Sequence, residues 1–124
     1  MPIHLTISHP TRLVVAIAKE TLTLKDIELY LDEVVVKEAM GYRKIFDLSH
    51  AEVALGDNDI MQLGARISAY AVTARMGPLA IVAATPEAVA RARLFTTLAS
   101  AERPIKIFGE LHEARRWLDS VPGG

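Results

Sequence analysis

The sequence predicts an α/β fold on a mixed, mostly parallel β-sheet, with an N-terminal β-hairpin, then alternating strands and helices, and about four helices in all. Three observations predict it. Two strand-like runs stand close together at residues 3–7 and 12–18. Further apolar runs then alternate with stretches whose apolar residues recur at helical spacing. Finally, strands that alternate with helices are joined by right-handed crossovers, which make a sheet largely parallel.

A chain of 124 residues, of which 51% are hydrophobic, is large enough for a single core. We therefore expect one domain at residues 1–120 and a flexible C-terminal tail at 121–124. The mean hydropathy of +0.24 argues against disorder. With 14 basic and 15 acidic residues and no concentrated basic stripe, the chain is not expected to bind nucleic acid.

Other function classes are excluded by what the sequence lacks. Without cysteine there is no disulfide, no thiol catalysis and no cysteine-based zinc site. His4, His9, His50 and His112 are scattered, so we expect neither a metal nor a cofactor. The N-terminus does not look like a signal peptide, and no apolar stretch approaches the ~20 residues that span a bilayer. A cytoplasmic protein without membrane insertion is the expectation.

The N-terminal half supplies the hairpin and the first helix. Residues 3–7 alternate between apolar and polar, as in a half-exposed edge strand, and residues 12–18 form a continuous apolar run typical of a buried strand. Thr23 and Asp26 fit a capping box at the start of a helix. Gly41, after Met40, is the predicted end of that helix.

The middle of the chain combines a buried strand with a polar loop. Residues 44–48 form the strand, and the loop begins at Ser49-His50 and runs to Asp57-Asn58-Asp59, which offers capping oxygens to a long helix. In an open α/β sheet, ligands and partners collect where strand ends meet helix starts. This segment is therefore the predicted functional edge.

The C-terminal half repeats the strand–helix alternation. Residues 79–84 are apolar on both faces and predict a central parallel strand. Thr85-Pro86 marks the start of the next helix. A short strand at 105–108 and an amphipathic helix that carries Leu111, Ala114 and Leu118 complete the fold.

This order of elements resembles the STAS domain, the SpoIIAA-like fold of bacterial anti-sigma factor antagonists. The resemblance covers the chain from the hairpin to Leu118. It is carried by RLVVAIA at 12–18, by FDLS at 46–49 with Asp57 at the following helix start, and by GPLAIVA at 77–83. It implies a non-enzymatic regulatory or protein-interaction module. In STAS antagonists, a Ser or Thr at that helix start is phosphorylated and switches partner binding.

At that helix start this chain departs from the STAS pattern. The positions are Asp57, Asn58, Asp59 and Ile60, none of which has a hydroxyl group, and Ser49 lies earlier. The chain therefore looks like an uncharacterised SpoIIAA-like branch that lacks the phosphoserine switch. We expect an unidentified protein partner to bind the candidate contact residues, which are Ser49, His50, Asp57, Asn58 and Asp59.

A small-molecule binder is the alternative function. Some STAS-like and SpoIIAA-like folds are linked to lipid or nucleotide ligands, so the resemblance permits a small apolar or lipid-like ligand. The sequence offers aromatic residues for a connected apolar cavity. The candidate ligand-binding residues are Tyr30, Tyr70, Phe95 and Trp117.

A homodimer is expected on topological grounds. If strand order follows the chain, right-handed crossovers place the helices on one face of the sheet. The other face would then need a second subunit or a partner.

An enzyme is the least expected function. Asp47, Ser49 and His50 supply the residue types of a hydrolase triad, but triads are assembled from parts distant in sequence, and neighbouring residues of a strand point to opposite faces. No catalytic residue is assigned.

Overall fold

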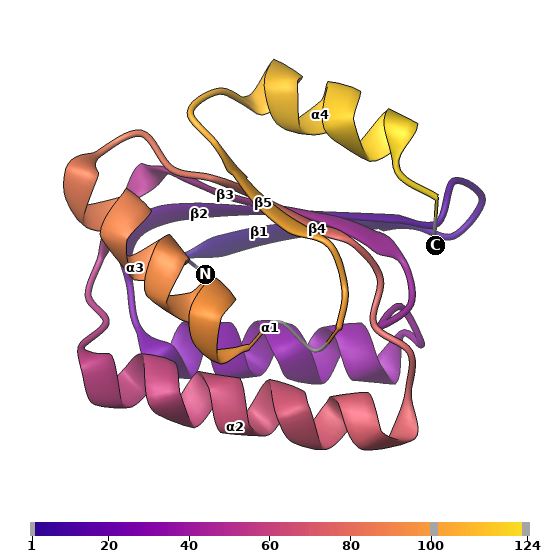
Figure 1. Cartoon of the computed structure of the whole chain (residues 1–124), viewed down its shortest axis with the longest axis horizontal. Helices are drawn as coiled ribbons and strands as arrows, with labels where there is room; N and C mark the ends of the chain where they lie inside the picture. Colours follow the sequence, from indigo (N-terminus) through magenta and orange to yellow (C-terminus); the bar gives the residue numbers. More distant parts are fainter. Residues whose placement is uncertain (1, 100–101, 123–124) are drawn as a thin grey trace.

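The protein is a five-stranded sheet with four helices in the order β-β-α-β-α-β-α-β-α (Figure 1). The computed structural model describes residues 2–99 and 102–122. The elements are β1 (Ile3–Ser8), β2 (Leu13–Leu22), α1 (Leu24–Val36), β3 (Arg43–Val53), α2 (Asp57–Thr73), β4 (Leu79–Val82), α3 (Pro86–Leu98), β5 (Ile105–Phe108) and α4 (Leu111–Ser120). Strand order follows the chain, with β1 antiparallel to β2 and the other neighbours parallel. The predicted mixed, mostly parallel sheet is confirmed.

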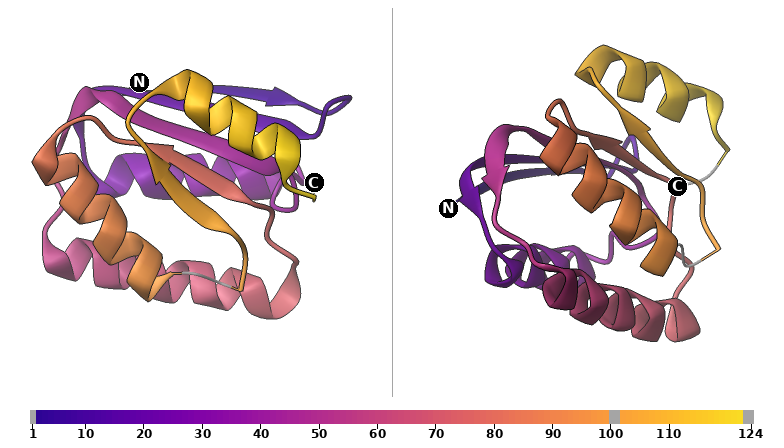
Figure 2. Two further views of the ribbon diagram at one scale, coloured as in Figure 1. Left: turned by 45° about the horizontal axis from the view of Figure 1, so that its top comes forward. Right: turned by 60° about the vertical axis from the view of Figure 1, so that its left-hand side comes forward.

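The helices cover both faces of the sheet. Helices α1, α2 and α3 lie on one face, and α4, which follows the last strand, returns over the other (Figures 1 and 2). There Ala114 and Leu118 pack against Ile45, Ala80 and Val82. The expectation of a bare face was therefore wrong, and no second subunit is needed to cover that face.

The larger core lies between the sheet and the three crossover helices. Alternate residues of β2, Val14, Ala16 and Ala18, point into it and are fully buried. Small residues in β2 leave room for the large side chains that α1 and α2 direct at the sheet. These are Ile27, Tyr30, Leu31, Val34, Leu63 and Ile67.

Helix α1 begins as predicted but ends early. Thr23 and Asp26 form the capping box, with each side chain accepting from the other's backbone N–H. The helix ends at Val36, so the predicted end at Gly41 was wrong. The N–H groups of Glu38 and the next residue donate to carbonyls of the last turn, while Glu38 adopts a left-handed φ of 56°. Glycine usually takes that position, so Glu38 did not indicate a helix end.

Strand β3 is longer than predicted. After a bulge it continues beside β2, with His50 opposite Lys19 and Val53 opposite Leu22. The predicted loop from Ser49 was therefore wrong, and the connection to α2 is short. The bulge is stabilised locally, because Asp47 Oδ1 accepts hydrogen bonds from the Ser49 backbone N–H at 2.9 Å and hydroxyl at 2.6 Å.

Helix α3 begins where the sequence predicted. Thr85 caps α3 by accepting from the Ala88 N–H at 3.1 Å, and Pro86 occupies the first turn. Of the predicted tail, 121–122 follow α4, and 123–124 lie outside the described residues. Among residues 2–99 and 102–122, no helix is long and apolar enough to cross a membrane.

Candidate functional site

The start of α2 is the exposed part of the predicted edge. Gly56 is the N-cap, and its backbone N–H donates to the Asp59 carboxylate at 2.9 Å, so Asp59 serves the cap. Asp57 and Asn58 are exposed. Asp57 Oδ1 lies 2.6 Å from the Arg91 guanidinium, which joins the start of α2 to α3.

Ser49 and His50 are separated from this helix start. They lie within β3, and the rest of that strand stands between them and α2. Ser49 is bonded to Asp47, which shares its strand face with Ile45 and so points to the side of the sheet covered by α4. Since α2 lies on the opposite side, the predicted contact residues fall into two groups.

The three triad residue types do not form a triad. Ser49 Oγ donates directly to Asp47 Oδ1, and no hydrogen bond joins His50 to either residue within the described ranges. A serine nucleophile needs a histidine between it and the carboxylate. The described residues also contain no group of three His, Asp or Glu side chains able to hold a metal ion.

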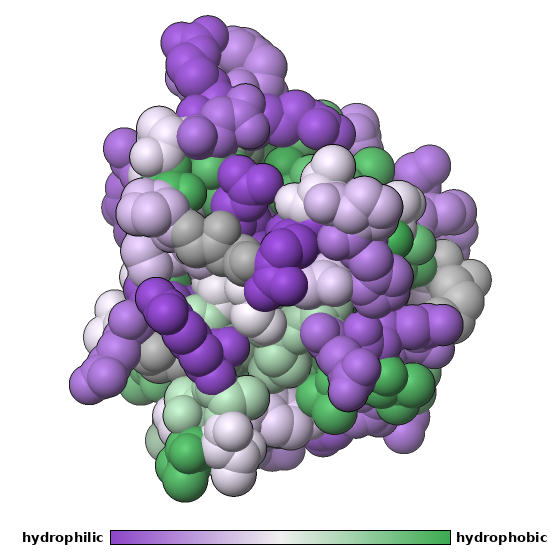
Figure 3. All heavy atoms as spheres, turned by 90° about the vertical axis from the view of Figure 1, so that its right-hand side faces the viewer, coloured by the Kyte–Doolittle hydropathy of each residue, from purple (hydrophilic) through white to green (hydrophobic). Residues whose placement is uncertain are grey.

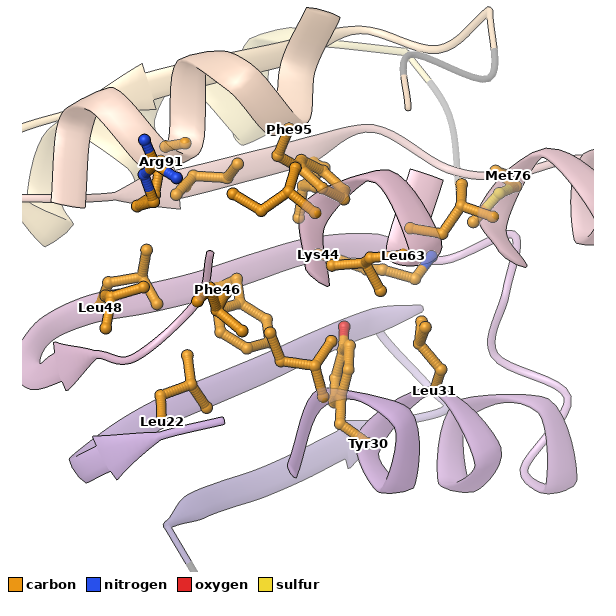
Figure 4. A pocket seen from close by; sticks show the side chains of 18 of the residues that line it. Leu22, Tyr30, Leu31, Lys44, Phe46, Leu48, Leu63, Met76, Arg91 and Phe95 are labelled. Carbon is orange, nitrogen blue, oxygen red and sulfur yellow. The ribbon is translucent and has the colours of Figure 1, made fainter. Parts of the chain in front are cut away.

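A cavity of about 80 Å³ lies between the sheet and helices α1, α2 and α3 (Figure 4). This volume is several times the roughly 10–15 Å³ that admits one water molecule. Its walls are almost wholly apolar. The lining residues include Leu22, Leu48, Val53, Ile60, Leu63, Met76, Ile81 and Phe95. An apolar cavity of this kind suits an apolar group better than water.

One end of the cavity carries buried cations. Lys44 and Arg103 are 3% and 8% exposed, and both line the cavity. Lys44 Nζ donates to the Tyr42 carbonyl at 2.8 Å and to the Met40 carbonyl. Arg103 donates through one terminal nitrogen to the Gly77 carbonyl at 3.3 Å, and its buried Nε has no partner within the described residues.

Burial shifts the pKa of each polar group at this end. Loss of hydration, assisted by nearby Arg103, lowers the pKa of Lys44 to about 7. Loss of hydration also lowers the pKa of Arg103 to about 10, against the opposing effect of Tyr30. Burial raises the pKa of the Tyr30 hydroxyl, which Arg103 partly offsets. The end of the cavity is therefore a poorly solvated site of positive charge.

The four predicted ligand-binding aromatics divide between the cavity and other places. Tyr30 and Phe95 line the cavity. Tyr70 lies outside its lining, and the Tyr70 hydroxyl accepts from Arg66 Nε at 3.0 Å. Trp117 belongs to α4 across the sheet, with its ring centroid 5.7 Å from that of Phe108.

Sequence analysis missed Lys44 and Arg103. Alternation along β3 gave a usable signal, because Lys44 shares a strand face with Phe46 and Leu48, both of which line the cavity. A lysine on an inward face needs acceptors, which the loop carbonyls before it provide. Arg103 has no comparable sequence signal, since it precedes β5 and reaches the cavity only through the fold.

Comparison with known proteins identifies the fold. The chain matches no protein-family model, and no curated protein sequence matches it. Among solved structures it is similar to an uncharacterised protein of the DUF3478 family from Shewanella loihica, which has a SpoIIAA-like fold. The match covers 94% of this chain and 91% of that one, with 18% sequence identity and a TM-score of 0.61. The protein therefore has a SpoIIAA-like α/β fold, as the sequence predicted.

Proposed function

We propose that the protein is a non-enzymatic, STAS-like regulatory or protein-interaction module that works without a phosphoserine switch. The SpoIIAA-like fold supports this class of function. The start of α2 is the proposed contact surface, because the resemblance to STAS antagonists implies partner binding at that helix start. The observation that carries this choice is an apolar side chain beside exposed polar groups: Met61 is 58% exposed, one helical turn after Asp57.

The other candidate contact residues have narrower roles in this proposal. Asn58 is exposed and unconstrained by the cap, so it belongs to the contact surface with Asp57. Asp59 orients the helix start through its bond to Gly56. Ser49 and His50 lie elsewhere on β3 and would contact a partner only if it reached around the sheet edge.

Site-specific photo-crosslinking in the native host tests this proposal. A photoreactive amino acid replaces Met61 in one variant and Val72 in a control. Val72 is 85% exposed and lies near the other end of the same helix. It is therefore an exposed apolar residue, like Met61, but lies away from the proposed contact surface. We expect one discrete protein adduct at position 61 and none at 72. Equal adducts at both positions, or none at either, would contradict the proposed surface.

A second candidate function is the binding of a small apolar or lipid-like ligand, and the apolar cavity supports it. Native mass spectrometry of protein purified gently from its host tests for a retained ligand. The same spectrum reports the number of subunits. The homodimer and the cytoplasmic location stay predictions of the sequence.

A further inference from the structure

We propose that the cavity binds an aliphatic monocarboxylate, whose carboxylate lies against Lys44 and Arg103 and whose alkyl chain lies between the sheet and the three crossover helices. This inference rests on the second proposed function, ligand binding in the cavity, and assigns that ligand a chemical class. The charged head and the apolar chain of such a ligand correspond to the two parts of the cavity.

The charge balance of the cavity argues for an anion. Two cationic side chains are buried together, and no Asp or Glu of the described residues forms an ion pair with either. Buried charges are ordinarily paired, because removing them from water is costly. Backbone carbonyls accept some of the hydrogen bonds that these two cations donate. The Nε–H of Arg103 has no acceptor, and Lys44 keeps one N–H beyond its two carbonyl bonds.

The available donors match a carboxylate. An Arg side chain offers parallel N–H groups to the two oxygens of a carboxylate, and an ammonium group adds a further donor. The Tyr30 hydroxyl, which has no hydrogen-bond partner within the described residues, points into the same cavity (Figure 4). The rest of the cavity wall is apolar, so a ligand with one negative charge and an apolar chain suits the cavity.

Within the described residues, only one end of the cavity has cations without a carboxylate partner. Arg91 also lines the cavity, and in Figure 4 it lies far from Lys44, at the same end of the view as Leu48. Its guanidinium is already paired with Asp57 at 2.6 Å. The head group is therefore assigned to the Lys44 end and the alkyl chain to the space toward Leu48 and Phe95.

The Lys44 end also adjoins a second hollow. Arg103 and Met76 line both the cavity and a second, more polar hollow that includes Arg75, Gly77 and Pro78. Figure 3 faces this end of the molecule, where hydrophilic residues predominate. A carboxylate at this end would lie near water, with its chain directed inward.

Isothermal titration calorimetry at pH 6, below the pKa of Lys44, tests the assignment with sodium butyrate, whose three-carbon chain suits a cavity of about 80 Å³. The comparison ligand is 1-butanol, which has a similar chain and no charge. We expect butyrate to saturate one site per chain and butanol to bind at least tenfold more weakly. Lys44→Gln and Arg103→Gln retain N–H donors for the loop carbonyls but remove the charge, so each should weaken butyrate binding at least tenfold. Arg93→Gln is the control, because Arg93 is an exposed arginine of α3 outside the cavity lining, and it should change butyrate affinity less than twofold.

The outcomes separate the ligand class from the ligand function. Equal binding of butyrate and butanol would leave a ligand cavity and overturn the carboxylate assignment. Binding of neither would overturn ligand binding itself along with the assignment. Unchanged butyrate affinity in a folded Lys44→Gln variant, or an equal loss of affinity in Arg93→Gln, would overturn the placement of the head group.

A measurement on the unaltered protein covers the case in which the glutamine variants do not fold. Butyrate labelled with ¹³C at its carboxyl carbon is titrated with acid while bound to the wild-type chain. A carboxylate held by two cations should have a pKa at least one unit below that of free butyrate. A bound carboxylate that titrates like the free one would overturn the assignment.

Discussion

Ser49 donates both its backbone N–H and its hydroxyl to one carboxylate oxygen of Asp47, at 2.9 and 2.6 Å. Asp47 is 3% exposed, so this carboxylate depends on those donors in place of water. The pair lies at the bulge of β3, where the register with β2 shifts. It stabilises the part of this central strand that leads to the connection with α2.

Replacing Asp47 should therefore destabilise the fold more than replacing Ser49. Asp47→Ala removes the acceptor of both hydrogen bonds and should lower the free energy of unfolding by about 2 kcal/mol. Ser49→Ala removes one donor and keeps the backbone bond, so a loss of about 1 kcal/mol is expected. Urea unfolding of the two variants and wild type measures the difference. A larger loss from Ser49→Ala would show that the carboxylate is not the organising group.

A negative charge introduced at Ser49 would imitate phosphorylation of that residue. Ser49→Asp would place two carboxylates side by side at the bulge, and like charges at this distance repel. This variant should be less stable than Ser49→Ala at neutral pH, as measured by urea unfolding, and equal stability of the two variants would contradict the repulsion. Phosphate on Ser49 would meet the same repulsion, which argues against Ser49 as a phosphorylation switch.

Lys44 should make stability depend on pH. The folded Lys44 loses its proton near pH 7 and the unfolded lysine near 10.5, so between these values the unfolded chain binds more protons. The free energy of unfolding of the wild type should therefore rise from pH 7 to 9 by about 2 kcal/mol relative to Lys44→Gln. Arg103 and Tyr30 titrate at higher pH, outside this window. Parallel curves for wild type and variant would contradict the shifted pKa.

Gly77 should not tolerate any side chain. A Cβ atom there would lie 2.2 Å from the Tyr42 carbonyl oxygen and 2.5 Å from that of Gly41, and both neighbours are backbone. Gly77→Ala should lower the free energy of unfolding by about 3 kcal/mol, because two chain segments must separate. Gly109→Ala is the control, since nothing lies within 4 Å of its Cβ position. Equal unfolding midpoints in urea would contradict this close approach.

Local signals in the sequence were sufficient for most of the fold. The capping box at Thr23 and Asp26 and the cap at Thr85 fix helix starts through bonds between near neighbours. The strand at 12–18 is recognisable because both of its faces are covered. These features depend on residues a few positions apart, which is the range that sequence patterns report well.

The parts that the sequence did not predict depend on distant contacts. Residues 49–53 form a strand because β2 extends to Leu22 and supplies hydrogen bonds beside them. Helix α4 covers the second face because the chain turns back after β5, which no local pattern requires. The polar end of the cavity joins Lys44 to Arg103, residues on different segments, so composition and spacing gave no reason to pair them.

The ion pair between Asp57 and Arg91 should contribute little to stability, and this makes Asp57 a clean probe of the proposed contact surface. Its side chains are 74% and 30% exposed, and exposed pairs are screened by water and salt. Asp57→Asn should change the free energy of unfolding by less than about 0.5 kcal/mol, as measured by urea unfolding. If adducts at position 61 are lost in a variant that unfolds like wild type, the loss reports partner contact. Asp59→Asn is the contrasting variant, because it weakens the bond to the Gly56 N–H and should destabilise the start of α2. A large loss of stability in Asp57→Asn would instead make the pair a structural tie between α2 and α3.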